Sequence, residues 1–129
     1  MHEKNAARIA ADQFMNEEQK GMKLRAGDRL KAIRELMGMT REEFGQLIDI
    51  DWVRIKNIEQ KKARVAEDEF AKIGQMFPEL MPWLTYEGDI DLEGLKTSQE
   101  KLCRLVAAKI EAGQIPSGFY LEEKIKRAS

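Results

Sequence analysis

The segment from Asp51 to Arg64 holds the side chains with the clearest binding chemistry in this chain. It carries five basic and two acidic residues, a local charge of +3, although the whole chain has a net charge of −1. Lysine and arginine attract phosphate groups. Arginine also donates two hydrogen bonds to guanine O6 and N7, and asparagine pairs with adenine N6 and N7. Any nucleic-acid binding therefore has to come from a local surface such as this one.

Catalytic and metal-binding chemistry finds little support in the sequence. No nucleophile–base pair and no glycine-rich phosphate loop occurs. The one histidine, His2, lies near the amino terminus, and the one cysteine, Cys103, reads as a small buried apolar residue. Asp89, Asp91 and Glu93 lack the later ligands of a calcium-binding EF-hand loop. We expect neither an enzyme, nor a cofactor, nor a metal site.

Composition predicts an all-α protein. The 129 residues are 43% hydrophobic and 35% charged, enough apolar material for a core. Ala, Leu, Glu, Lys and Met outnumber the β-branched residues, and no period-2 strand pattern is evident. A single cysteine excludes an intrachain disulfide and suits a reducing compartment. With no run of 18 apolar residues and no signal-peptide pattern, we expect a cytoplasmic protein without a membrane segment.

Helices are expected on both sides of the basic segment. A helix over 23–37 ends at Gly38, a suitable C-cap. Thr40 and Glu43 form a capping box that starts a short helix ending near Asp49. Asp51 is the expected N-cap of the next helix, 51–60, which buries Ile55 and Ile58 and turns its other residues outward. A further helix is expected over 66–76.

Additions flank this core. An amphipathic helix is expected over 5–20, one short helical turn within 77–86, a polar acidic linker over 87–94, a helix over 95–112 with a wide apolar face, and a last helix over 118–127. Pro116 prevents a continuous helix between the last two of these helices. The expected domains are an N-terminal helical extension (1–21), a helical core (22–86) and a C-terminal helical extension (87–129).

The linear order of four motifs resembles the Cro/Xre-type helix-turn-helix family of phage-repressor-like regulators. "GDRLKAIRELMGMT" (27–40) is similar to the family's first helix and the entry to the second. "TREEFGQLIDI" (40–50) resembles its second helix and turn, and "DWVRIKNIE" (51–59) its recognition helix. "KKAR" and "FAKIGQMF" match the basic loop and the following helix. Asp49 and Lys61 stand where the family commonly has glycine, at positions that tend to need φ > 0.

The resemblance implies a five-helix core and a sequence-specific regulator, a repressor, that binds double-stranded DNA. The 51–60 helix then enters the major groove, where its exposed residues meet base edges. An ion pair between Arg34 and Glu59 is implied as a structural feature. The implied base contacts are Asp51, Trp52, Val53, Arg54, Lys56 and Asn57, and the implied phosphate contacts are Thr40, Arg41, Gln60, Lys61, Lys62 and Arg64.

Other interpretations remain open. The polar residues of the 51–60 helix could form an ordinary solvated face, and the basic residues after it an idle surface run. Trp52 could pack on the N-terminal helix or on a partner. Such regulators usually bind two-fold sites as dimers, and we expect the 95–112 helix either to fold back on the core or, the favoured choice, to form a homodimer. The alternative function is a protein-interaction module, antitoxin-like or an adaptor, that binds an unidentified protein through Trp52 and Val53. The arrangement of Arg41, Arg54, Lys61, Lys62 and Arg64 as one positive face would discriminate the two.

Overall fold

The computed structural model describes residues 25–128, which are mostly helical, as predicted. The predicted helix over 5–20, the 1–21 extension and His2 lie outside the described residues. Within 25–128, none of the helices combines the length and the apolar character needed to cross a membrane. The helices are α2 (Ala26–Met37), α3 (Arg41–Ile48), α4 (Trp52–Glu59), α5 (Glu67–Met76), the 3₁₀ helix η1 (Pro78–Leu80), α6 (Met81–Tyr86), α7 (Leu92–Lys96), α8 (Lys101–Glu111) and α9 (Leu121–Lys124).

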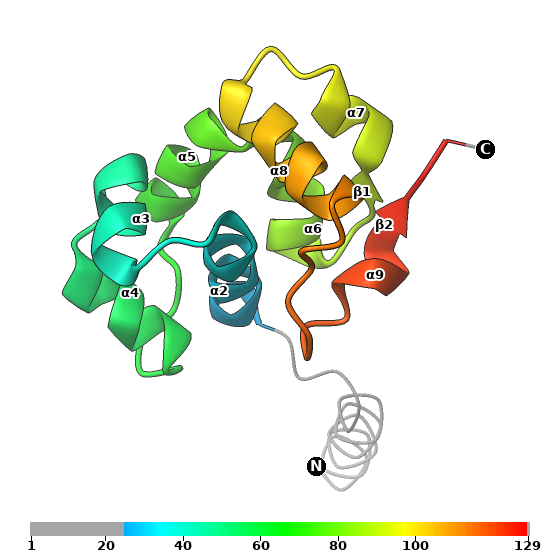
Figure 1. Cartoon of the computed structure of the whole chain (residues 1–129). Helices are drawn as coiled ribbons and strands as arrows, with labels where there is room; N and C mark the ends of the chain where they lie inside the picture. The colour runs from blue at the N-terminus through cyan, green and yellow to red at the C-terminus, as the bar shows by residue number, and fades with distance from the viewer. Residues whose placement is uncertain (1–24, 129) are drawn as a thin grey trace, which may run out of the picture.

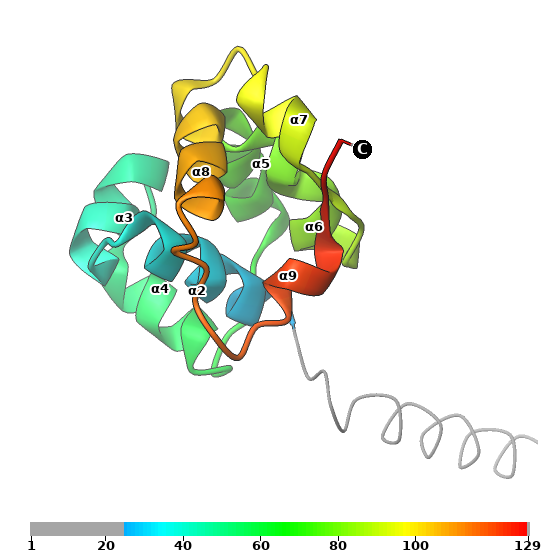
Figure 2. The same cartoon turned by 45° about the vertical axis from the view of Figure 1, so that its right-hand side comes forward.

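Helix α2 is the centre of the arrangement. It contacts α4 on one side and α6 and α8 on the other. Figures 1 and 2 show α3 and α4 together on one side of the molecule, with α6, α7 and α9 on the other side and α8 between them. The helix ends at Gly38, whose φ of 70° is the left-handed conformation expected of a glycine C-cap. The chain then turns sharply into α3.

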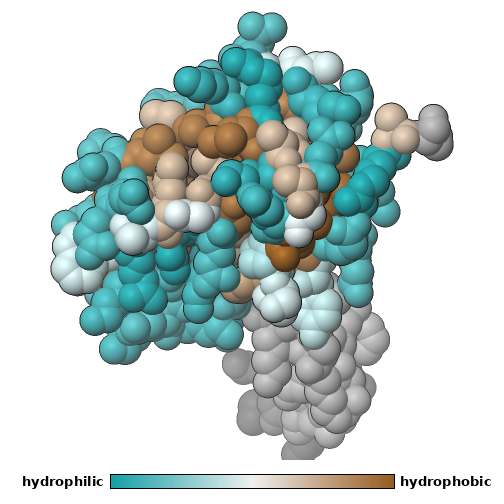
Figure 3. Space-filling model, viewed as in Figure 1, coloured by the Kyte–Doolittle hydropathy of each residue, from teal (hydrophilic) through white to brown (hydrophobic). Residues whose placement is uncertain are grey.

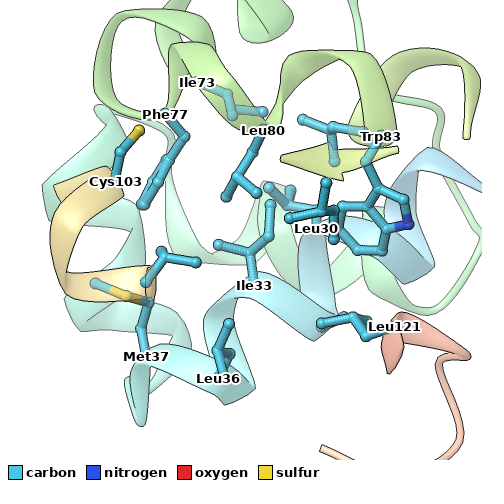
Figure 4. Close-up of a cluster of buried hydrophobic side chains, with 14 of the residues drawn as sticks. Leu30, Ile33, Leu36, Met37, Ile73, Phe77, Leu80, Trp83, Cys103 and Leu121 are labelled. Carbon is cyan, nitrogen blue, oxygen red and sulfur yellow. The ribbon is translucent and has the colours of Figure 1, made fainter. Parts of the chain in front are cut away.

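The apolar face of α2 forms the middle of the core (Figure 4). Leu30 and Ile33 are fully buried and lie against side chains from α5, η1 and α6, including Phe77, Leu80 and Trp83. Burial of each large apolar side chain contributes about 1.5–3 kcal/mol to folding. This shared core fixes α2 and, through it, the position of α4.

The predicted single helix over 95–112 is wrong. The chain forms α7 and α8 with a break between them at residues 97–100. Ser98 is buried in the break, where its hydroxyl donates to Glu79 Oε2 at 2.7 Å and accepts from the Glu100 backbone N–H at 3.0 Å. Serine hydroxyl groups that bond nearby backbone compete with continuous helix, which explains the interruption.

Two further expectations in the C-terminal extension need correction. The 87–94 segment is not a simple polar linker, because it contains the buried Ile90 and Leu92 and the strand β1 (Ile90–Asp91). The last helix is shorter than the expected 118–127, since it gives way to β2 (Ile125–Lys126), which pairs in parallel with β1. Residue Ile90 lies opposite Ile125 in this pair, and both are buried. The C-terminal end of the described chain therefore closes over the core.

The apolar face of the 95–112 segment packs inside one chain. Cys103, Val106, Ala107 and Ile110 of α8 are buried, and α8 contacts α2. Of the two arrangements expected for this segment, folding back on the core is the one found. The buried face of α8 is therefore not free to pair with a second chain, although Leu105 on its outer side is 39% exposed.

Candidate nucleic-acid interface

Helix α4 has two different faces. The Asp51 carboxylate accepts a hydrogen bond from the Val53 backbone N–H at 3.1 Å and so caps the helix, as predicted. Ile55 and Ile58 are fully buried and attach the helix to the core, whereas Trp52 and Val53 are 41% and 44% exposed. Figure 3 shows that the surface over α4 and the loop after it, at the lower left, is hydrophilic. The outward face of α4 is thus available to a partner.

The connection from α3 to α4 is tight. Asp49 has a φ of 58°, and the Ile50 backbone N–H reaches the Gly45 carbonyl oxygen at 3.0 Å. A Cβ atom added at Gly45 would lie 2.4 Å from the Ile50 carbonyl oxygen, so the turn packs directly against α3. Lys61, after α4, has a φ of 63°. Both positions expected to need positive φ adopt it.

Thr40 and Arg41 lie at the start of α3. Thr40 Oγ1 accepts from the Glu43 N–H at 3.1 Å, and Glu43 Oε1 accepts from the Thr40 N–H at 2.9 Å, which completes the predicted capping box. The Arg41 guanidinium does not point into open solvent, because its Nε donates to Glu59 Oε1 at 3.0 Å. Its side chain is 30% exposed.

Arg34 and Glu59, which the resemblance implies as an ion pair, lie in direct contact. Arg34 donates from Nε and Nη2 to the two Glu59 carboxylate oxygens at 2.7 and 3.0 Å. The Glu59 side chain is 1% exposed, and its hydrogen bonds raise the pKa of Arg34 above the usual arginine value. With Arg41 also bound, this carboxylate ties α2, α3 and α4 together.

Arg54, expected as a base contact, is engaged within the chain. Its Nε and Nη2 donate to the two oxygens of Glu69 at 2.8 and 2.9 Å, and Nη2 also donates to the Arg64 carbonyl oxygen at 2.7 Å. The hydrogen bond to Arg54 is the main reason that the pKa of Glu69 is lowered. Glu69 was not singled out from the sequence, because a partner fifteen positions away on another helix leaves no local pattern.

Lys61 is also partly engaged, since its Nζ lies 3.4 Å from Asp28 Oδ2 of α2. Gln60, Lys62 and Arg64 are exposed, and Lys56 and Asn57 are half-buried. Among residues 25–128, the side chains of Lys56, Lys62 and Arg64 have no hydrogen-bonding or ionic partner. The five cations named as a possible positive face therefore divide into three that are paired and two that are free.

A groove of about 680 Å³ lies between the start of α2 and the loop after α4. Four cations line it, and its remaining lining residues are small or apolar, among them Ile58 and Phe70. The cations are Arg25, Lys61, Lys62 and Arg64. The free cations of the loop therefore belong to one continuous, positively charged surface that suits the binding of anionic groups.

In the part of the chain described here, no group of three or more His, Cys, Asp or Glu side chains is placed to hold a metal ion. Cys103 is fully buried.

In comparisons with protein families, curated proteins and solved structures, nothing matches this chain. The candidate interface is therefore the exposed face of α4 together with the loop that follows it.

Proposed function

We propose that the chain is a sequence-specific DNA-binding regulator of transcription, a repressor, with a helix-turn-helix core that inserts α4 into the major groove. The observation that carries this proposal is the form of α4. The helix is anchored by Ile55 and Ile58, leaves its other face exposed, and continues into a loop with the unpaired cations Lys62 and Arg64. A helix that is fixed from behind and flanked by cations suits reading of base edges.

The exposed and half-buried residues on the outward face of α4 provide suitable base-reading chemistry. Asn57 pairs with adenine through N6 and N7, and the apolar surfaces of Trp52 and Val53 pack on thymine methyl groups. Lys56 reaches a base edge or a phosphate. Asp51 caps the helix and so lies at the end of α4 that faces the groove floor. Arg54 is a weaker candidate than the sequence suggested, because its guanidinium is bound to Glu69.

Phosphate contacts come from both sides of α4. The start of α3 offers Thr40 and backbone N–H groups with the partial positive charge of a helix N-terminus. Gln60, Lys61, Lys62 and Arg64 follow α4, and the groove that three of them line extends the positive surface to Arg25. Two copies of the chain then occupy the halves of an inverted repeat, because one recognition helix reads few base pairs.

Salt-dependent binding tests the phosphate contacts. Binding of a labelled duplex of random sequence is followed by fluorescence anisotropy as the salt concentration rises. The double variant Lys62→Ala/Arg64→Ala should lower the slope of log K against log salt by about 2, since each phosphate contact contributes about 0.9. The control Lys101→Ala/Lys126→Ala removes two exposed cations elsewhere and should leave the slope unchanged. Equal slopes in both double variants would contradict the proposed phosphate contacts.

A second candidate function is a protein-interaction module. It is favoured by the exposure of Trp52 and Val53, and by the pairing of Arg41, Arg54 and Lys61 with acidic residues of the same chain. Exposed aromatic residues with apolar neighbours are typical anchors of protein interfaces. This function predicts no salt-sensitive binding to duplex DNA even at low ionic strength, so the same titration separates the two.

A further inference from the structure

We propose that Arg54 and Glu69 form a positioning pair that holds the basic loop, residues 60–66, in the shape that meets phosphates, and that Arg54 does not read a base. The inference rests on the proposed DNA-binding function for its purpose. Its structural content, an ion pair that fastens the second half of this loop, stands on the geometry alone.

The pair closes the loop from α4 to α5. Glu69 Oε1 accepts from Arg54 Nη2 at 2.9 Å and from the Ala66 backbone N–H at 2.7 Å. Arg54 Nη2 also donates to the Arg64 carbonyl oxygen at 2.7 Å. One guanidinium and one carboxylate thus fasten the backbone on either side of Val65, next to the free cation Arg64.

The first half of the loop has a separate support. The Asn57 carbonyl oxygen accepts from the backbone N–H groups of Lys62 and Ala63 at 2.8 and 3.2 Å, and Lys61 turns the chain with its positive φ. No backbone hydrogen bond of this kind holds Arg64 or Val65 among the described residues. The second half is therefore held by the packing of Val65 against the core and by the Arg54–Glu69 pair.

The burial of Glu69 explains why Arg54 remains bound to it when the protein binds DNA. The Glu69 side chain is 10% exposed, and release of Arg54 would leave it largely buried without its cation. Arg54, whose side chain is 38% exposed, would also give up its three hydrogen bonds to Glu69 and to the Arg64 carbonyl oxygen. Glu69 lies in the first turn of α5, where the helix N-terminus also favours a carboxylate.

Limited proteolysis tests the positioning role without DNA. Trypsin cuts after Arg64 only when the second half of the loop opens, and mass spectrometry reports this cut beside the cut after Lys62 in the separately supported first half. Glu69→Gln should speed the cut after Arg64 about tenfold, since a hydrogen bond to a charged group is lost, and should change the cut after Lys62 less. The control Glu67→Gln changes an exposed carboxylate in the same helical turn, and trypsin should cleave it at the same rate as the unaltered protein. Equal cutting rates in Glu69→Gln and Glu67→Gln would overturn the proposal.

DNA binding by the same folded variants separates positioning from base reading. Positioning predicts that Arg54→Ala and Glu69→Gln weaken binding by a similar factor, that the double variant is no weaker than either, and that base preference is unchanged. If Arg54 reads a base, Arg54→Ala loses preference at one base pair while Glu69→Gln keeps it or binds more tightly; this result also overturns the proposal. Absence of DNA binding by the unaltered protein would remove the proposed function, whereas the proteolysis result would still decide whether the pair holds the loop.

Discussion

Replacement of Glu59 by glutamine removes the carboxylate that joins α2, α3 and α4. Arg34 contributes two hydrogen bonds to it, at 2.7 and 3.0 Å, and Arg41 one at 3.0 Å. The Arg34 side chain is 13% exposed, so Glu59→Gln leaves a largely buried guanidinium without its counter-charge. Removal of one partner from a buried ion pair costs about 3–5 kcal/mol. Arg41 is more exposed, and Arg41→Ala should cost about 1 kcal/mol or less.

Urea denaturation followed by tryptophan fluorescence measures both effects, because the buried Trp83 reports on the core. A typical domain has about 5–15 kcal/mol of stability, so Glu59→Gln should remain folded at 25 °C with a much lower urea midpoint. Its thermal midpoint should fall by at least about 12 °C. Glu42→Gln, on the exposed side of α3, is the control and should change neither the urea midpoint nor the thermal midpoint. A cost below about 1 kcal/mol for Glu59→Gln would refute the claim that this network holds the three helices together.

Three other predictions concern single positions. Gly45→Ala should lower the free energy of unfolding by about 1–3 kcal/mol in urea denaturation, because the added Cβ would lie 2.4 Å from the Ile50 carbonyl oxygen. The control Gly74→Ala, also within a helix, meets only Met81 at 3.7 Å and should raise the free energy of unfolding by up to about 1 kcal/mol. Equal effects of the two substitutions would be inconsistent with the tight turn. Burial raises the pKa of the Cys103 thiol to about 11, so alkylation at pH 8 should be far slower in the folded protein than in urea, and similar rates would argue against its burial. Arg54 keeps the pKa of Glu69 below its ordinary 4.5, so the ion pair stabilises the fold above pH 4.5 and this stabilisation is lost as the pH falls further. The difference in the free energy of unfolding between the unaltered protein and Glu69→Gln should therefore shrink on acidification. A constant difference would count against the ion pair.

Short-range signals in the sequence predicted the local geometry around α4 well. The capping box at Thr40, the N-cap at Asp51 and the glycine C-cap at Gly38 all involve hydrogen bonds between residues a few positions apart. Such features depend on neighbouring residues and can be read from a linear pattern. The positive φ angles of Asp49 and Lys61 were instead implied by the resemblance, in which both positions commonly hold glycine.

Long-range partners left no local pattern in the sequence, and the Arg34–Glu59 pair was expected only through the resemblance. The break between α7 and α8 depends on Ser98 meeting Glu79, and the shortened last helix depends on Ile125 pairing beside Ile90. In the candidate interface, the Arg54 guanidinium is bound by Glu69, a residue of another helix. An apolar stripe on a helix likewise does not say which surface will cover it, so the face of α8 could be assigned to α2 only from the structure.

Selection of bound fragments from a pool of random duplex DNA by the purified full-length protein is the most direct test of the proposed function. We predict an enriched inverted repeat, with binding that weakens steeply as salt rises and a preference at one position that is lost in Asn57→Ala. An output pool without any enriched motif, from protein shown to be folded, would contradict sequence-specific DNA binding and would favour Trp52 and Val53 as the anchor of a protein interface.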